Sequence, residues 1–185
     1  MNLADAADDL DEVLLTKDQI STRIAEISRE IERDLAGETP LLVGVLKGAV
    51  MVMSDLSREL RIPAEMDWMA VSSYGDSHET SGVVKILKDL DAAMEGRHVV
   101  IVEDIVDSGL TLSWLLGNFR SRGAASLRVM TLLRKPEAMK VDVPLDYVGF
   151  DIPNKFVVGY GLDFANQYRT LDGVAVLKPS VYGGE

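Results

Sequence analysis

Three acidic residues close together in the chain are the first candidates for chemistry. They lie in the stretch VVIVEDIVDSGLTLSWLL, residues 99–116, where Glu103 and Asp104 follow an apolar run and Asp107 comes soon after. Carboxylates accept hydrogen bonds and bind hard metal ions. These acids can therefore hold the hydroxyl groups of a ribose, directly or through a metal ion. The simpler alternative is that Glu103 and Asp104 cap a turn and that Asp107 caps a helix.

The turn that follows the acids is typical of a phosphate-binding loop. Gly109 permits a positive φ angle and a close approach of the backbone, while Ser108 and Thr111 offer hydroxyl groups. The N–H groups at a helix start also favour an anion, so residues 107–111 predict a cradle for a monophosphate. The chain has neither a P-loop pattern nor a G-x-G-x-x-G pattern after a strand, which excludes those two kinds of phosphate site. Acids and turn together favour a sugar-phosphate site over simple capping.

The elements expected to position these residues alternate between strands and helices. Residues 40–46 form a short apolar run that predicts a buried strand, and a helix is expected from Gly48 to Leu60. Residues 99–102 are apolar on both faces, so their strand should be central. Further strands are expected at residues 64–74, 82–90, 98–104, 126–135 and 147–153, and a helix at 111–123. This order predicts an α/β fold with a mainly parallel sheet, which binds ligands at the carboxyl ends of its strands.

The N-terminal part predicts one amphipathic helix. Thr16 and Gln19 fit a capping box, and apolar residues then recur at three- and four-residue steps until the helix ends near Gly37. Residues 1–12 match no pattern of this kind and are expected to form a flexible acidic lead. No repeat or linker interrupts the chain, so residues 1–185 are expected to form a single domain.

Composition excludes several classes of protein. The formal net charge of −11 argues against a nucleic-acid binder, which needs a basic surface. There is no cysteine, which excludes disulfides and thiolate metal sites. The N-terminus carries no signal peptide or membrane span, so a cytoplasmic location without a membrane partner is expected. Anionic small substrates stay possible, because local donors and a divalent metal can override the global charge.

The stretch VVIVEDIVDSGLTLSWL resembles the phosphoribosyl-pyrophosphate signature of type I phosphoribosyltransferases. The resemblance implies their fold, a mainly parallel central sheet flanked by helices with a small hood region. It implies that Glu103 and Asp104 orient the ribose and help to hold Mg²⁺. The loop 107–111, including the backbone amide of Leu110, would bind the 5′-phosphate, and Asp107 would be the catalytic general base.

Two further segments resemble parts of the same family. GVLKGA, residues 44–49, is similar to its pyrophosphate loop, with Lys47 and Gly48 in the matching places. In the family the peptide bond before this lysine is often cis. The polar stretch 71–82 resembles a mobile lid whose Ser-Tyr pair matches Ser73 and Tyr74 and closes over the substrates.

The C-terminal half, through TLLRKP and YVGFDIPNKFVVGYGLDFANQYR, closely resembles the family members that act on 6-oxopurines. The resemblance implies purine salvage, in which hypoxanthine, guanine or both react with phosphoribosyl pyrophosphate to give IMP or GMP and pyrophosphate. Lys135 would donate to the 6-oxo group, Phe156 would stack on the base, and Val157 would contact its edge through the backbone. Asp163 would hold Mg²⁺, and Arg169 would bind pyrophosphate. The family also implies a homodimer or homotetramer.

The sequence leaves several alternative functions and a few residues without an assigned role. A regulator on the same fold that binds RNA or DNA would need a basic face, which the acidic composition disfavours. Among other transferases, one that acts on adenine is disfavoured, because the ammonium of Lys135 would face an amino group. Xanthine as a substrate stays open, as does the preference for hypoxanthine or guanine. The choice between a dimer and a tetramer is open as well. Gly161 indicates a tight approach of the backbone to a ligand, and His78 and His98 are expected at the surface.

Overall fold

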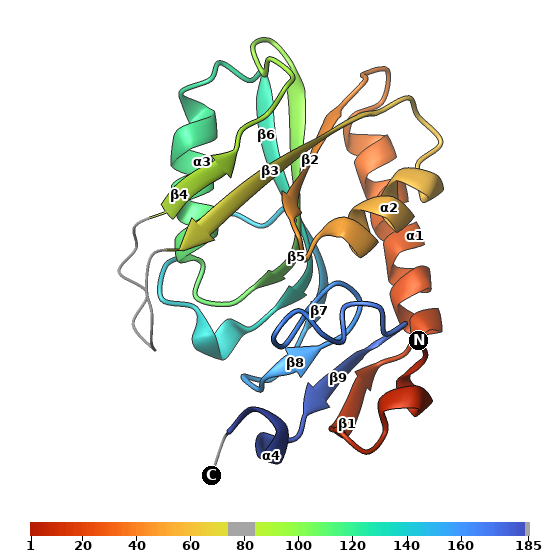
Figure 1. Ribbon diagram of the computed structural model, residues 1–185. Helices are drawn as coiled ribbons and strands as arrows, with labels where there is room; N and C mark the ends of the chain where they lie inside the picture. The colour runs from red at the N-terminus through yellow and green to blue at the C-terminus, as the bar shows by residue number, and fades with distance from the viewer. Residues whose placement is uncertain (74–83, 184–185) are drawn as a thin grey trace.

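The computed structural model describes residues 1–73 and 84–183, and a six-stranded sheet forms its centre (Figure 1). Its strands are β2 (Leu41–Leu46), β3 (Glu65–Ser73), β4 (Val84–Lys88), β5 (His98–Val106), β6 (Ser126–Arg134) and β7 (Tyr147–Asp151). They are ordered β4-β3-β2-β5-β6-β7. The pairs from β3 through β7 are parallel, whereas β4 pairs antiparallel with β3 at one edge. β5 lies inside the sheet, as its two apolar faces predict.

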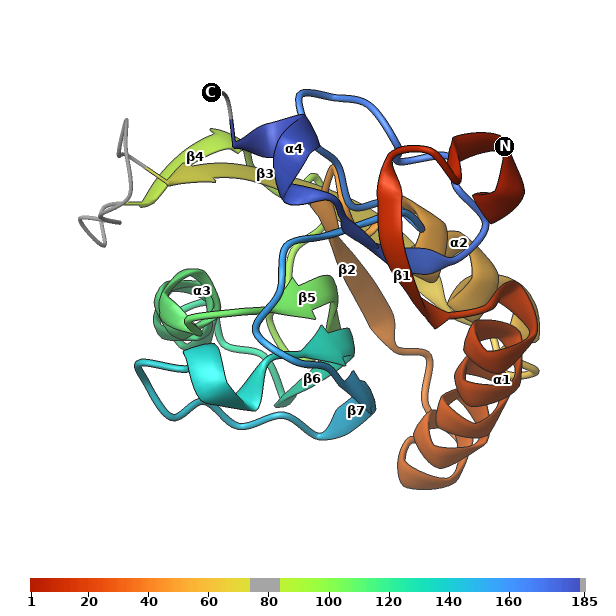
Figure 2. The same ribbon diagram turned by 90° about the horizontal axis from the view of Figure 1, so that it is seen from below.

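Helices cover both faces of this sheet. α1 (Lys17–Asp34) and α2 (Val50–Glu59) pack on one face, and α3 (Leu110–Arg120) packs on the other (Figure 2). The predicted capping box of α1 is confirmed, because Gln19 N donates to Thr16 Oγ1 at 3.4 Å and Thr16 N donates to Gln19 Oε1 at 2.8 Å. The isoleucines at the predicted spacing are fully buried. The predicted α/β fold is therefore confirmed.

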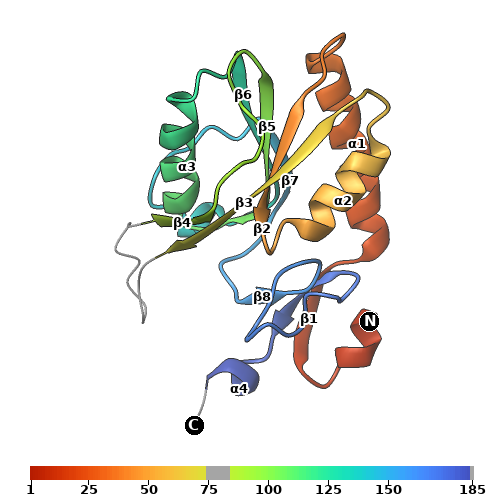
Figure 3. The same cartoon turned by 45° about the horizontal axis from the view of Figure 1, so that its top comes forward.

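A second, smaller sheet contains β1 (Leu10–Leu15), β9 (Val174–Leu177) and β8 (Val157–Val158), all antiparallel. We call this sheet, together with the loop 159–173, the hood. The short helices η1 (Leu3–Ala6) and α4 (Pro179–Tyr182) flank it, and η2 (Pro136–Ala138) follows β6. The hood lies beyond one end of the central sheet, with both described ends of the chain beside it (Figures 1 and 3).

The expected lead over residues 1–12 differs from the structure. These residues form η1 and the first half of β1, and Leu10 of β1 pairs with Leu177 of β9. Lys178 N donates to Asp9 O at 2.9 Å. Ala6 and Leu10 are buried in the apolar core of the hood. The segment is ordered by a partner far along the chain, which a local pattern cannot reveal.

The end of β5 also differs from expectation. β5 continues to Val106, two residues beyond its expected end at Asp104, so Glu103 and Asp104 are both followed by further strand residues. β4 is antiparallel and lies at the edge of the sheet, which agrees with the expected mainly parallel sheet. Sequence periodicity locates strands better than it locates their ends or their partners.

Candidate active site

The predicted phosphate cradle is a tight turn between β5 and α3. Gly109 adopts a φ of 76° just before α3 begins at Leu110. A Cβ atom at Gly109 would lie 3.0 Å from the carbonyl oxygen of Val141. Both the positive φ angle and this close contact therefore disfavour a side chain at this position. Lys140 N donates to Ser108 O at 3.0 Å and ties the turn to the segment after β6. The turn is therefore built as the sequence predicts.

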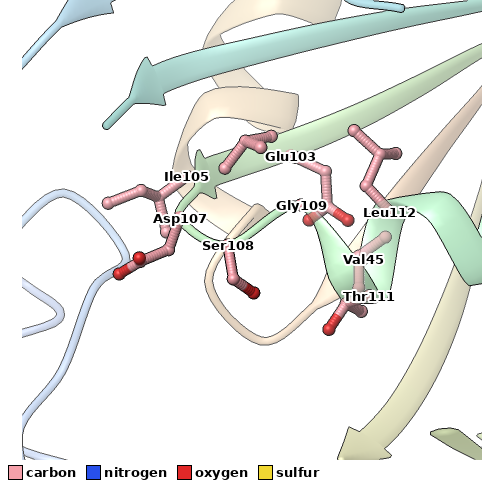
Figure 4. A pocket seen from close by; sticks show the side chains of 9 residues that line it. Val45, Glu103, Ile105, Asp107, Ser108, Gly109, Thr111 and Leu112 are labelled. Carbon is pink, nitrogen blue, oxygen red and sulfur yellow. The ribbon is translucent and has the colours of Figure 1, made fainter. Parts of the chain in front are cut away.

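A pocket of about 180 Å³ opens above this turn (Figure 4). The hydroxyl groups of Ser108 and Thr111 point to the same side of the turn. Typical small-molecule pockets measure about 300–1,000 Å³, so this one fits part of a ligand, such as a phosphate and its sugar. Its lining residues are Val45, Glu103, Ile105, Val106, Asp107, Ser108, Gly109, Thr111 and Leu112.

The adjacent acids of β5 serve different places, as expected from the alternation of side chains along a strand. Glu103 lines the pocket and is buried. Asp104 instead lies against Gly48, where a Cβ atom would be only 1.7 Å from Asp104 Oδ2. The turn after β2 and Asp104 of β5 are therefore in direct contact, and only glycine fits at position 48.

Burial changes the acidity of both groups. It raises the pKa of Glu103 well above its usual value, and the charge of Asp104 raises it further. Burial also raises the pKa of Asp104 to about 6, although the N–H of Ile105 and the charge of Arg169 act in the opposite direction. Closely spaced, desolvated carboxylates of this kind are typical of functional sites.

Asp107 and Lys135 form an ion pair at the edge of the pocket. Lys135 Nζ donates to Asp107 Oδ2 at 2.9 Å. The lysine side chain is 9% exposed and the aspartate side chain 53% exposed. Lys135 N also donates to Val106 O at 3.0 Å, which holds the end of β6 beside the end of β5. A buried donor and an open acceptor therefore lie next to each other.

The turn after β2 lies against the hood. The peptide bond between Leu46 and Lys47 is cis, as the family resemblance implies, and the Lys47 side chain is exposed. A Cβ atom at Gly161 would lie 2.0 Å from Gly48 O. Gly161 is thus required for contact between two backbone segments, and the expected approach of its backbone to a ligand stays a prediction.

Arg169 and Asp163 form a second ion pair in the hood. Arg169 Nη2 lies 2.6 Å from Asp163 Oδ1, and its Nη1 donates to Gly161 O at 2.7 Å. Asn166 N donates to Asp163 Oδ2 at 2.8 Å. The guanidinium is near enough to Asp104 to oppose the rise of its pKa. The structure therefore brings these hood residues to the same region as Asp104 and Gly48.

Phe156 and Val157 lie at the edge of the hood. Val157 is buried and pairs with Val176 of β9, whereas Phe156 is 39% exposed. The ring of Tyr182, from α4, stacks on Phe156 at 4.8 Å between centroids and 28° between planes. Phe164 and Phe156 form a T-shaped pair with their ring centroids 6.0 Å apart. The partly exposed ring is thus held in a defined orientation.

The carboxylates of Glu103, Asp104 and Asp163 fit Mg²⁺ by their chemistry, since hard oxygen donors suit this ion. Burial is the main cause of the raised pKa of Asp104, and the charge of Asp163 adds to it. A cation nearby would relieve that repulsion. Within residues 1–73 and 84–183, however, no three such side chains are close enough to hold a metal together. Further oxygen ligands would have to come from a substrate.

A few predicted residues are not described by the structure, and a few residues of the pocket were not predicted. Tyr74 and His78 are outside the described residues, and of Ser73 only the backbone at the end of β3 is described. Ile105 and Leu112 line the pocket without having been predicted. Their positions between the acids and just inside α3 are the signal that could have revealed them.

Comparisons with known proteins agree with one another. Residues 12–165 match the family model described as "Phosphoribosyl transferase domain". The chain is 58% identical over 180 residues to a hypoxanthine-guanine phosphoribosyltransferase of Mycobacterium avium, covering 94% of this chain and 89% of that one. It is 49% identical to the Bacillus subtilis protein of the same name, covering 94% and 97%. A crystal structure of a Staphylococcus aureus hypoxanthine phosphoribosyltransferase matches with a TM-score of 0.92 and 43% identity, covering 95% and 96%. The similarity thus includes both the central sheet and the hood.

Proposed function

Since the chain belongs to the phosphoribosyl transferase family, we propose that it is a purine salvage enzyme. It converts hypoxanthine, guanine or both, with phosphoribosyl pyrophosphate, to IMP or GMP and pyrophosphate. The names of its relatives from Mycobacterium avium and Bacillus subtilis support this substrate class.

The observation that carries the proposal is the ion pair of Lys135 and Asp107. A 6-oxopurine presents its 6-oxo acceptor and its N7–H donor on one edge. A lysine donor and a carboxylate acceptor 2.9 Å apart match this pattern. Adenine would instead turn an amino group toward the ammonium. Phe156, partly exposed and held by Tyr182, would stack on the face of the base.

The residues of the pocket would act on the sugar and its phosphate. The turn 107–111, through the Leu110 amide and the hydroxyls of Ser108 and Thr111, would hold the 5′-phosphate. Glu103 and Asp104 would orient the ribose, and in their ionised form they would suit the cation-like ring that forms as the C1–O bond breaks. Asp107 would accept the N7 proton as general base.

The other end of the site would hold pyrophosphate. Lys47 and Arg169 supply positive charge there, and Gly48 allows the backbone to approach. Magnesium, held by substrate oxygens with Glu103, Asp104 or Asp163, would neutralise charge on the departing pyrophosphate. The lid predicted from Ser73 and Tyr74 would exclude water during transfer and stays a prediction.

Partners and location follow the family. We expect small-molecule substrates, no nucleic acid, a homodimer or homotetramer, and a cytoplasmic location. In the described part of the chain, no helix has the length and hydropathy needed to cross a bilayer.

An assay with five radiolabelled bases tests the function. Hypoxanthine, guanine, xanthine, adenine and uracil are each incubated with the chain and phosphoribosyl pyrophosphate, with magnesium or with a chelator. Nucleotide is expected from hypoxanthine or guanine, only with magnesium, and not from adenine or uracil. Xanthine is the alternative substrate, because contacts to the 2-position are expected to be mostly with the backbone. Adenine as the preferred base, or no nucleotide from any base, would refute the proposal.

A further inference from the structure

Tyr160 connects the hood to α2 in a way that the proposed chemistry does not use. It is a buried hood residue in the left-handed region, with a φ of 49°. Its hydroxyl donates a hydrogen bond to Asp55 of α2. Across the described residues, no other side-chain hydrogen bond links the loop 159–173 to α2. Burial raises the pKa of Tyr160, so the phenol remains a donor over the whole range of an enzyme assay.

Gly161, the residue after Tyr160, contacts both Gly48 and Arg169, which are expected to bind pyrophosphate. Gly161 packs against Gly48 so closely that a Cβ atom would lie 2.0 Å from the Gly48 oxygen. Gly161 N donates to Arg169 O at 2.9 Å, and Arg169 Nη1 donates back to Gly161 O at 2.7 Å. The position of this one peptide therefore sets the spacing between Gly48 and Arg169.

The other partner, Asp55, is rigidly connected to the same end. The turn containing Lys47 and Gly48 leads directly into α2, and Met53 N donates to Ala49 O at 2.8 Å. Asp55 also accepts a hydrogen bond from Arg58 one turn further along α2, which orients its carboxylate. A helix transmits position because its hydrogen bonds keep the residues in register.

We propose that Tyr160 and Asp55 are positioning residues for pyrophosphate, holding the hood residues Asp163 and Arg169 at a set distance from Lys47 and Gly48. The inference rests on the proposed function, because it assumes that this end binds pyrophosphate. The base end is held by other contacts, namely the Lys135–Asp107 pair between β5 and β6 and the Tyr182 ring on Phe156. Loss of the Tyr160–Asp55 bond therefore weakens binding of phosphoribosyl pyrophosphate more than binding of the base.

The test measures the KM for phosphoribosyl pyrophosphate, the KM for the base and the calorimetric Kd for pyrophosphate with magnesium. Tyr160→Phe and Asp55→Ala are expected to raise the KM for phosphoribosyl pyrophosphate and the Kd about tenfold, since losing a hydrogen bond to a charged group has about this effect. The KM for the base should change less than about threefold. Asp55→Asn keeps an oxygen acceptor and should stay within about threefold of the wild type.

Tyr147→Phe is the matched control. Tyr147 is a buried tyrosine whose hydroxyl also donates to an aspartate, Asp34 at 3.1 Å, on α1 away from the site. The Tyr147→Phe variant should have a lower unfolding midpoint than the wild type and unchanged KM values for both substrates. Should Tyr160→Phe not fold, the comparison of Asp55→Ala with Asp55→Asn decides, because Asp55 is only partly buried.

The outcomes separate this inference from the proposed function. A wild-type chain that makes no nucleotide from any base refutes the proposed function. A wild-type chain that is active, with variants that raise both KM values equally or neither, refutes only the positioning role.

Discussion

At the scale of single residues, the ion pair of Lys135 and Asp107 would combine recognition of the base with proton transfer under the proposed function. Lys135 is buried and Asp107 is half exposed, so the base would meet a fixed donor and an accessible acceptor. The arrangement explains why an acid follows the acids of β5 so closely. Glu103 and Asp104 are expected to serve the sugar end, whereas Asp107 pairs with Lys135 at the end of β6, where the base is expected.

Replacing the general base should affect turnover and leave the fold intact. Asp107→Asn is expected to lower kcat by about 10²–10⁴-fold, the usual effect of losing a general base. Stability should change little, because the side chain is 53% exposed. Steady-state kinetics and circular dichroism measure the two effects. Asp142→Asn, an exposed acid on the neighbouring loop, is the control and should keep full turnover. Near-normal turnover in folded Asp107→Asn would contradict the assigned role.

Replacing the lysine should affect the base selectively. Lys135→Ala is expected to weaken use of hypoxanthine and guanine by about 1–3 kcal/mol in kcat/KM, the cost of losing a charged hydrogen bond. The KM for phosphoribosyl pyrophosphate should hardly change. Lys140→Ala, which removes an exposed lysine nearby, serves as the control. Equal losses for both substrates would indicate misfolding instead.

At the scale of elements, the short helix α4 supports the base end from the hood. Phe156 is contacted by Tyr182 in a stacked arrangement and by Phe164 in a T-shaped one. Phe156 is 39% exposed, so without these contacts its ring would be free to change rotamer. The last described helix of the chain is therefore tied to the residue expected to stack on the purine.

Removing this support should weaken base binding. Tyr182→Ala is expected to raise the KM for the base about 2- to 10-fold, since an aromatic pair contributes about 0.5–1.5 kcal/mol. The KM for phosphoribosyl pyrophosphate should stay the same. Tyr182→Phe keeps the stacked ring and should behave like the wild type. If Tyr182→Ala leaves the KM for the base unchanged, α4 has no part in base binding.

At the scale of the whole molecule, the acidic site lowers the stability of the fold. Asp104 has a pKa of about 6 in the folded chain, against an ordinary value of 3.8, mainly because it is buried. The folded state therefore binds this proton more tightly than the unfolded state does. Its contribution to stability is most favourable at low pH and declines as the pH rises from about 3.8 to about 6.

An uncharged substitute should therefore stabilise the chain at neutral pH. Asp104→Asn is expected to raise the free energy of unfolding by about 1–3 kcal/mol above about pH 7 and by much less near pH 4, while lowering activity. Ile105 N donates to Asp104 Oδ1 at 2.9 Å. Asparagine keeps a side-chain oxygen that can accept this hydrogen bond. Urea unfolding at both pH values measures the difference. A gain that is the same at both pH values would show that the charge of Asp104 is not its cause.

The sequence by itself determines the local parts of this protein. The capping box of α1, the central strand β5 and the turn at Gly109 follow from residues within a few positions of one another. The order of acids, serine, glycine and threonine, together with the family resemblance, predicts the sugar-phosphate site. Local hydrogen bonds and backbone preferences decide these features, so a short window of sequence contains the information.

Only the tertiary structure decides which distant residues meet. β1 pairs with β9, from the other end of the chain, and so forms the hood sheet. Gly48 meets Gly161, and Tyr160 meets Asp55, across more than a hundred residues. Such contacts depend on the packing of whole elements, and many pairings of short apolar strands are compatible with the same local pattern. The site therefore has parts that the sequence predicts, at a spacing that only the packing of the hood on the central sheet determines.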